Sequence, residues 1–290
     1  MNIIYALSYL IFLEMKRKFL GTKYFAELDV TDNCNLRCRH CYHFLDKGDN
    51  LEKEVPIRVW KKRLENLHRN GIRFVLLVGG EPALRKDVLM LADRLFPFVY
   101  VITNGTIKIP GEFDHPLFVS LDGTEKTNDH LRGKGVFSSV MKNYSGDSRA
   151  VINMTLDAKN YTELEDVVIA AKKNGLRGVV CNLYTPTLGK NNKFFIKADE
   201  RKRIITELRR MKKKYPEHFM FTESMIKWYD DCDHRGFCFW GDEALHFDSS
   251  WKRRRCFSDK ADCSNCGCLA GSFQNLLSLL REPRVMMKFL

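Results

Sequence analysis

The residues best suited to do chemistry are three cysteines, Cys34, Cys38 and Cys41, with the spacing C-x3-C-x2-C. Three thiolates held on one loop suit three irons of a cubane 4Fe-4S cluster. A cluster that only transfers electrons normally has four cysteine ligands, so this loop leaves one iron open to bind a reactant. The same spacing also allows a zinc loop or a set of buried thiols. The position of the loop, directly after an expected strand, favours the cluster.

The run from Cys34 to Cys41 resembles the radical S-adenosylmethionine (SAM) superfamily. In that family the open iron binds the amino and carboxylate groups of SAM, and reductive cleavage yields a 5′-deoxyadenosyl radical. The resemblance implies an enzyme with a 4Fe-4S cluster and SAM as cofactors. It also implies an electron donor such as ferredoxin or flavodoxin as a partner.

A glycine-rich turn, Gly79-Gly80-Glu81-Pro82, directly follows the continuous apolar run 72–78, which we expect to be a strand buried on both faces. Glycines let the backbone approach a ligand closely, and a carboxylate can receive an ammonium group. One strand after the cysteine loop, this turn resembles the methionine-binding "GGE" motif of the same family. The resemblance implies that Glu81 contacts the ammonium group of SAM.

The resemblance also assigns SAM contacts to polar residues on the following strands. Each of them could instead be ordinary loop chemistry, because Asn-Gly and Asp-Gly readily form turns. Their placement on successive strand ends argues for a shared ligand, since ligands bind at that end of a parallel barrel. The residues implied for ribose, carboxylate or adenine are Thr103, Asn104, Ser120, Asp122, Arg132 and Asn153.

A second group of cysteines lies in the last fifth of the chain and comprises Cys238, Cys256, Cys263, Cys266 and Cys268. Four thiolates would close a second cluster and leave one to spare. The pattern resembles the auxiliary-cluster extensions of SPASM or twitch type, although the family's glycine before the second cysteine is missing. A zinc knuckle or a single-iron site is the alternative. Cys232 could be a further ligand, whereas Cys181 is expected in a strand core.

Strand-like and helix-like segments alternate along the chain, which predicts parallel strands joined by crossover helices. The resemblance implies a partial (β/α)6 barrel for residues 25–229, between an amphipathic segment at 1–24 and a small Cys-rich unit at 230–290. The expected strands are 25–30, 72–78, 99–102, 117–121, 150–156 and 178–183. The expected helices are 56–70, 87–96, 135–144, 161–174 and 198–215.

Composition narrows the class of protein. The chain has 290 residues, 44% of them apolar, a net charge of +12 and ten cysteines. Cysteines clustered at metal-ligand spacings, with no signal peptide, favour a reducing cytoplasm over a disulfide framework. The charge suits nucleic acid, an anionic membrane or an anionic substrate. Nucleic acid is not expected, because no aromatic-and-basic binding module is present.

The N-terminal run 3–13 is apolar and is followed by Lys16-Arg17-Lys18. It is too short to span a bilayer. A helix lying in the membrane interface and a helix packed on the protein itself fit equally well. Translation from Met15 would remove the segment.

Three hypotheses for the substrate follow. The first is a membrane lipid or isoprenoid chain joined through a new C–C bond at the inner face of the membrane, by a loose resemblance to enzymes of hopanoid biosynthesis and of archaeal lipid cross-linking. The second is a peptide or protein that receives a thioether or C–C cross-link, or is matured. The third is a scaffold without catalysis. Tyr184 and Cys181 are candidates for hydrogen relay, with simple packing as the alternative.

Overall fold

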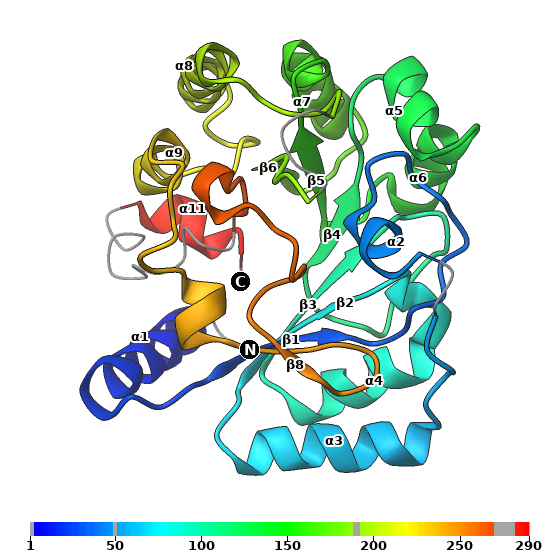
Figure 1. Cartoon of the computed structure of the whole chain (residues 1–290), viewed down its shortest axis with the longest axis vertical. Coiled ribbons are helices and arrows are strands. Elements are labelled where there is room, and N and C mark those ends of the chain that lie inside the picture. Colours follow the sequence, from blue (N-terminus) through cyan, green and yellow to red (C-terminus); the bar gives the residue numbers. More distant parts are fainter. Residues whose placement is uncertain (1–2, 49–50, 188–191, 270–281, 290) are drawn as a thin grey trace.

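The computed structural model describes residues 3–48, 51–187, 192–269 and 282–289. Its centre is a curved, mostly parallel sheet of eight strands in the order β6-β5-β4-β3-β2-β1-β7-β8. Helices cover the outer side of this sheet, as Figure 1 shows. The predicted partial (β/α)6 barrel is therefore confirmed.

Strands β1 to β6 follow one another in space as they do in sequence, and every neighbouring pair is parallel. Their carboxyl ends therefore share one rim, where ligands of such folds bind. The strands are β1 (Phe25–Asp29), β2 (Phe74–Val78), β3 (Phe98–Thr103), β4 (Leu117–Ser120), β5 (Ala150–Leu156) and β6 (Gly178–Leu183).

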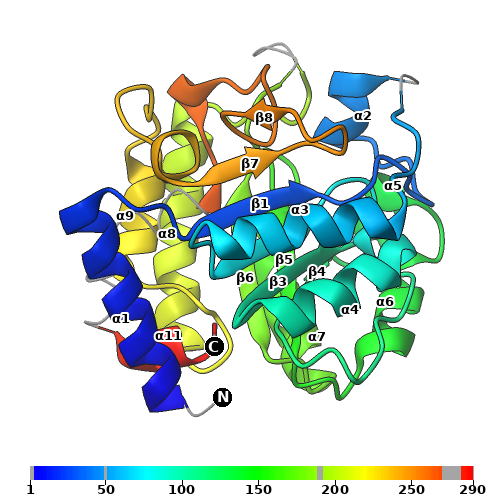
Figure 2. The same ribbon diagram turned by 90° about the horizontal axis from the view of Figure 1, so that it is seen from below.

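Helices connect these strands, and Figure 2 shows α3 (Ile57–Arg69) and α4 (Lys86–Leu95) side by side next to β1. Amphipathic sequences explain this layer; in α3, for example, Trp60, Leu64 and Leu67 are buried and face the sheet. The helices and 3-10 turns of the barrel are α2 (Tyr42–Lys47), α3 (Ile57–Arg69), η1 (Pro82–Arg85), α4 (Lys86–Leu95), α5 (Glu125–Arg132), α6 (Val136–Tyr144), η2 (Tyr161–Glu163), α7 (Leu164–Lys173) and α8 (Ala198–Lys214).

The C-terminal part of the chain extends the same sheet, which the sequence did not indicate. Strand β7 (Leu245–Phe247) lies parallel to β1, and β8 (Arg253–Arg254) lies antiparallel to β7. Such short strands carry too little periodicity to be recognised from sequence. The other elements here are α9 (Glu223–Asp230), the π-helical turn η3 (Phe239–Glu243), η4 (Cys263–Asn265) and α11 (Pro283–Met287).

Aromatic side chains fill the amino-terminal half of the barrel interior. Phe74 packs against Phe25 and Tyr100 with ring centroids 4.3 and 4.5 Å apart, and Tyr100 lies 5.2 Å from Phe118. Each such pair contributes about 0.5–1.5 kcal/mol beyond its buried area. This packing closes the interior from below, so the cavity opens at the carboxyl ends of the strands.

The N-terminal helix α1 (Ile3–Leu20) packs on the protein through one face, on which Ala6, Leu10 and Leu13 are buried. Tyr9 stacks on Phe98 at the start of β3, with ring centroids 6.2 Å apart. The opposite face is apolar and exposed, through Tyr5, Phe12, Met15 and Phe19. Within the described part of the chain, no helix is both long and apolar enough to cross a bilayer.

Candidate active site between two groups of cysteines

A cavity of about 260 Å³ lies at the carboxyl ends of the strands, and Cys34, Cys38 and Cys41 line one side of it. The three cysteines belong to the loop that joins β1 to α2. The loop is fixed on both sides, because Arg39 N–H donates to the Leu131 carbonyl and Cys41 N–H to the Cys38 carbonyl. Three thiols therefore face one space from a single ordered loop, as the sequence predicts.

The two glycines after β2 allow this loop to approach the sheet. A Cβ added at Gly79 would lie 2.5 Å from the Thr31 carbonyl oxygen, and one at Gly80 would lie 2.2 Å from the Asn33 carbonyl oxygen. Gly79 also has φ +123°, which disfavours any side chain. Because residues 31–33 lead directly into Cys34, these glycines position the cysteine loop as well as line the cavity.

Glu81 lines the cavity but is strongly tied to the protein. One carboxylate oxygen accepts hydrogen bonds from Ala83 N–H (2.9 Å) and Thr103 Oγ1 (2.6 Å), and the other accepts from Asn104 N–H (2.7 Å). Burial raises the pKa of Glu81, while these donors oppose that rise. A carboxylate oxygen has more than one acceptor position, so Glu81 keeps room for an ammonium group. Pro82 is buried behind it in η1.

Asn104 links the end of β3 to the cysteine loop. Its side-chain amide donates to Asn35 Oδ1 at 2.9 Å and lies 3.8 Å from the sulfur of Cys34. The backbone N–H of Leu36 also donates to the Cys34 sulfur, at 3.4 Å. N–H donors to sulfur stabilise the thiolate form that an iron–sulfur cluster needs.

Arg132 lines the cavity and is held from behind by Asp122. Arg132 Nε lies 2.5 Å from Asp122 Oδ2, and His40 Nε2 lies 3.1 Å from the same oxygen. Burial alone would raise the pKa of the Asp122 carboxyl, but the charges of Arg132 and His40 outweigh burial and hold this pKa well below its usual range. Asp122 is fully buried and does not line the cavity. Its place in the structure is that of a residue that positions Arg132.

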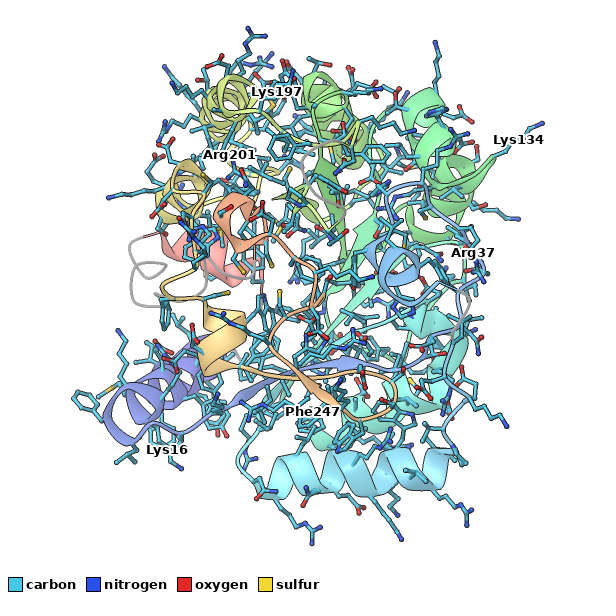
Figure 3. The ribbon with its side chains drawn as sticks, in the orientation of Figure 1. Lys16, Arg37, Lys134, Lys197, Arg201 and Phe247 are labelled. Atoms are coloured by element: carbon cyan, nitrogen blue, oxygen red, sulfur yellow. The ribbon has the colours of Figure 1, made fainter. Side chains whose placement is uncertain are left out.

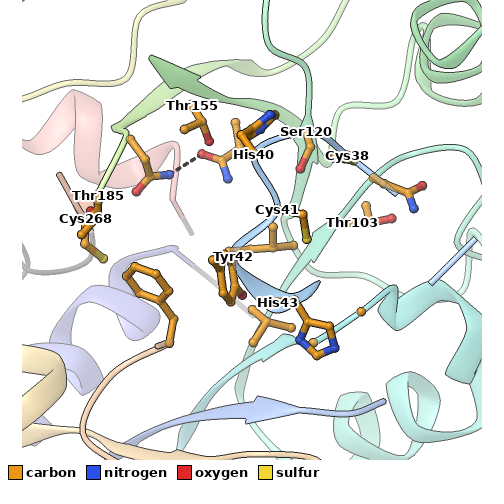
Figure 4. A pocket seen from close by; sticks show the side chains of 18 of the residues that line it. Cys38, His40, Cys41, Tyr42, His43, Thr103, Ser120, Thr155, Thr185 and Cys268 are labelled. Atoms are coloured by element: carbon orange, nitrogen blue, oxygen red, sulfur yellow. Dashed lines mark hydrogen bonds between the residues drawn. The ribbon is translucent and has the colours of Figure 1, made fainter. Parts of the chain in front are cut away.

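The opposite wall of the cavity comes from β4, β5 and β6 and carries hydroxyl and amide groups. Ser120 and Asn153, for which the sequence predicts SAM contacts, line it. Asn182 donates from its side-chain amide to Asn153 Oδ1 at 2.8 Å, the bond drawn in Figure 4. The further hydrogen-bonding residues of this wall are Thr155, Tyr184, Thr185 and Thr187.

Of the two residues considered for hydrogen relay, one lines the cavity and the other is buried in the core. Tyr184 lines the cavity, and no described residue hydrogen-bonds its hydroxyl. Cys181 is fully buried and lies outside the lining of the cavity. Packing therefore accounts for Cys181.

The second group of cysteines surrounds one small neighbouring cavity. Cys238, Cys256, Cys263, Cys266 and Cys268 all line it, although they come from three separate segments between α9 and residue 269. Cys268 lines the larger cavity as well, on the side opposite Cys41 in Figure 4. The N–H of Cys268 donates to the Cys266 sulfur at 3.4 Å. Cys232 does not line either cavity.

Arg201 in α8 fixes the segment that carries three of these cysteines. Its guanidinium donates to the carbonyls of Tyr229 (2.9 Å), Asn265 (3.3 Å) and Cys266 (3.1 Å). Figure 3 shows Arg201 pointing into the protein, unlike the outward Lys134. The sequence indicated only a basic helix here, because a buried arginine within a charged run has no local signal.

The donor sets fit the metal groups that the sequence implies. Burial raises the pKa of Cys38 and of Cys266 to about 11, so these thiols are protonated at neutral pH without a metal. A bound cluster needs thiolates, and loading it therefore releases protons. Three thiols at one cavity and five at the next match an open cluster and a closed one.

Several residues that line the cavity were not predicted from the sequence. Tyr42, Trp240 and Phe257 line the cavity between the two cysteine groups, and the rings of Tyr42 and Phe257 lie 4.8 Å apart. Glu27 of β1 also reaches the cavity, and burial raises its pKa to about 7. The available signal for Glu27 was a carboxylate, followed two residues later by Asp29, inside an otherwise apolar strand.

Several known proteins are similar to part of this chain. Residues 28–142 match the model of the Radical SAM superfamily. The chain is 30% identical over 156 residues to the sporulation killing factor maturation protein SkfB of Bacillus subtilis, which covers 49% of this chain and 38% of that protein. It is 28% identical over 163 residues to the pre-heme d1 synthase of Dinoroseobacter shibae, covering 51% and 40%. The match thus spans well under half the length of either relative.

Among solved structures, Streptococcus suis SuiB bound to its precursor peptide SuiA superposes with a TM-score of 0.64 at 15% identity. The superposition covers 91% of this chain and 67% of SuiB. At this identity the likeness concerns the fold, and it extends beyond the residues that the family model matches.

Proposed function

The chain contains a radical SAM domain, and from this premise we propose that it is an enzyme that cleaves SAM reductively and modifies a peptide or protein. The observation that carries the proposal is the convergence of Cys34, Cys38 and Cys41 with the Gly79–Glu81 turn on one cavity at the strand ends. When bound, the cluster and SAM supply a 5′-deoxyadenosyl radical that removes hydrogen from carbon.

The residues around this cavity have separate tasks. Cys34, Cys38 and Cys41 would hold the cluster, and Glu81 and Arg132 would bind the ammonium and carboxylate of SAM, since their charges are opposite to those groups. With substrate bound at the mouth of the cavity, the walls would keep bulk water from a reactive carbon centre and so protect it from quenching. The cysteines at 238–268 would hold an auxiliary cluster beside the substrate, where it can accept an electron.

A peptide substrate fits the wall opposite the cysteines. Asn153, Thr155, Asn182 and Thr185 present amide and hydroxyl groups there. Part of this capacity is already used within the protein, because Asn182 bonds Asn153 and Thr185 Oγ1 accepts from Gly267 N–H. A hydrocarbon chain would leave the remaining donors and acceptors unpaired, at about 1–3 kcal/mol each, whereas peptide N–H and C=O groups would satisfy them. The relative SkfB, named a maturation protein, also supports this class of substrate.

A lipid substrate is the second candidate, and one observation favours it. Helix α1 exposes Tyr5, Phe12 and Phe19 on one face, and Lys16 and Lys18 lie on the same helix. Aromatic and basic side chains together suit the interface of an anionic membrane. The hydroxyl and amide groups on the cavity wall and the name of the relative SkfB favour the peptide, so we rank the lipid below it.

The proposed activity is tested under anaerobic conditions. Protein with reconstituted clusters is incubated with SAM and dithionite, alone, with a pool of synthetic peptides, and with a membrane-lipid extract, while 5′-deoxyadenosine and product masses are followed. We expect basal deoxyadenosine in every sample, with faster formation and a peptide that has lost a hydrogen pair in the peptide sample. Acceleration by lipid alone would favour the second candidate. No deoxyadenosine in any sample would contradict the enzyme itself.

A further inference from the structure

A second group of buried ligating side chains lies inside the barrel and contains no cysteine. Strand β1 carries Glu27 and Asp29 on its inner face, and β7 places His246 opposite Glu27 in the parallel register. All three residues are buried, with exposed fractions of 6%, 2% and 1%. Their nearest ligand atoms lie within 4.8 Å of one another.

The geometry of the imidazole is unusual for a structural histidine. His246 Nε2 lies 3.7 Å from Glu27 Oε1 and 3.7 Å from Asp29 Oδ1, too far for a hydrogen bond to either. Among the described residues, neither ring nitrogen of His246 has a hydrogen-bond partner, and neither has Asp29 Oδ2. Buried polar atoms in native proteins are nearly always paired, so these orphans indicate a missing occupant.

The arrangement excludes a simple proton relay through the ring. A relay would place one carboxylate at each ring nitrogen. Here the same nitrogen faces both Glu27 and Asp29. One nitrogen and two oxygens that converge on a common point instead form the donor set of a cation.

Distance and charge agree with a metal ion. Ligand bonds of about 2.1 Å at a tetrahedral angle place the ligand atoms about 3.4 Å apart, close to the 3.7 Å observed. Within the described residues, His246 is the only ion-pair partner of either carboxylate. Two ionised carboxylates carry more negative charge than one imidazole can offset, and a divalent ion bound between them would neutralise that excess.

We propose that Glu27, Asp29 and His246 bind one divalent metal ion of the class that accepts mixed nitrogen and oxygen ligands, such as Zn²⁺, Fe²⁺ or Mn²⁺. Glu27 lines the large cavity, so the ion has one side toward the substrate space. The donor set contains no thiol, which separates this site chemically from both cysteine groups. The inference does not rest on the proposed function, because it concerns binding of the ion alone.

The experiment uses Mn²⁺, because this ion prefers oxygen and nitrogen ligands to the thiolates of the cluster sites. Full-length protein with both cysteine groups loaded is titrated anaerobically with Mn²⁺, and free Mn²⁺ is followed by electron paramagnetic resonance. We expect one bound ion per chain, displaced by Zn²⁺. His246→Gln and Asp29→Asn should each weaken binding by more than about 10-fold, since a direct ligand matters at least as much as the groups that orient it.

Glu65→Gln is the matched control, because Glu65 is an exposed carboxylate on α3 and its loss removes the same charge. This variant should bind Mn²⁺ as the wild type does. Iron content and far-ultraviolet circular dichroism show whether each variant is folded, and Glu27→Gln replaces any variant that is not. Wild-type protein that binds no Mn²⁺ or Zn²⁺ beyond the cysteine sites would overturn the proposal, and so would unchanged binding in folded His246→Gln.

Discussion

The two cysteine groups face neighbouring cavities but are built in opposite ways. Cys34, Cys38 and Cys41 lie on one short loop, which the glycine turn after β2 and Asn104 hold against the barrel rim. The cysteines from 238 to 268 come from three segments and depend on contacts such as those of Arg201. The first group is therefore formed by one short loop, whereas the second group forms only when distant parts of the chain have packed together.

This difference explains why spacing alone located the first group. A loop of fixed length determines how close its thiols lie, so C-x3-C-x2-C specifies the site almost completely. The positions of Cys238 and Cys256 relative to the 263–268 segment depend instead on β7, β8 and η3, none of which the sequence indicated.

The largest expected effect is the loss of a thiol from the first group. Cys38→Ala should abolish SAM cleavage, because two remaining thiols cannot hold a site-differentiated cluster. The measurement is 5′-deoxyadenosine formed from SAM and dithionite after anaerobic reconstitution. Cys181→Ala is the control, since this cysteine is buried outside both cavities, and it should keep cleavage. Cleavage retained in Cys38→Ala would refute the assignment of the loop.

Loss of a thiol from the second group should separate the two halves of the reaction. Cys268→Ala leaves four thiols in the second group but removes the one that also lines the larger cavity, so it should lower product formation while 5′-deoxyadenosine still forms. Cys268 is the informative choice because it lines both cavities. Cys232 lines neither cavity, so Cys232→Ala should behave as wild type. Equal loss of SAM cleavage in Cys268→Ala would mean that the two groups do not act separately.

The fold was largely predictable from sequence, and so was the place of the 34–41 loop beside the strand ends. Residues 178–183 form β6 as expected, because a run that is buried on both faces has a clear apolar signal. The roles within the site were less accessible. Asp122 was expected at SAM, yet it is fully buried behind Arg132, since sequence gives the strand end and not the direction of the side chain.

The group formed by Glu27, Asp29 and His246 was equally hard to predict from sequence. Glu27 and His246 are far apart in sequence and meet only because β7 pairs with β1. Helix α5 was also not expected, because its sequence is polar and only Asn128 and Leu131 are buried in it. Pairings that depend on short strands at the edge of a sheet leave almost no local pattern to read.

The Arg132–Asp122 pair offers a test of how the barrel supports the first group. Arg132→Gln leaves the buried Asp122 carboxylate with His40 and the Thr155 N–H as its partners and should cost about 3–5 kcal/mol at neutral pH. The pKa of Asp122 is depressed in the folded protein, so its contribution to stability is present above the unfolded pKa of about 3.9 and is lost as pH falls through the folded value.

Urea unfolding of wild type and Arg132→Gln at several pH values measures this contribution. The difference in unfolding free energy should be largest near neutral pH and should shrink as the pH falls below about 4, because Asp122 then becomes neutral in the variant. Arg132→Lys keeps the charge and should recover part of the loss. A difference that does not depend on pH would show that packing, and not the ion pair, explains the role of Arg132.

The smallest expected effect concerns the packing that gathers the second group. Arg201→Lys keeps the positive charge but can serve fewer than the three carbonyls that the guanidinium serves now. The 263–268 segment should loosen, and its iron should be lost to a chelator about 10-fold faster. Iron of the first group should leave at the wild-type rate, because no contact of Arg201 reaches the 34–41 loop. Acceleration of both rates together would show that the two groups are coupled through the barrel, and the contrast between a local and an assembled site would then be wrong.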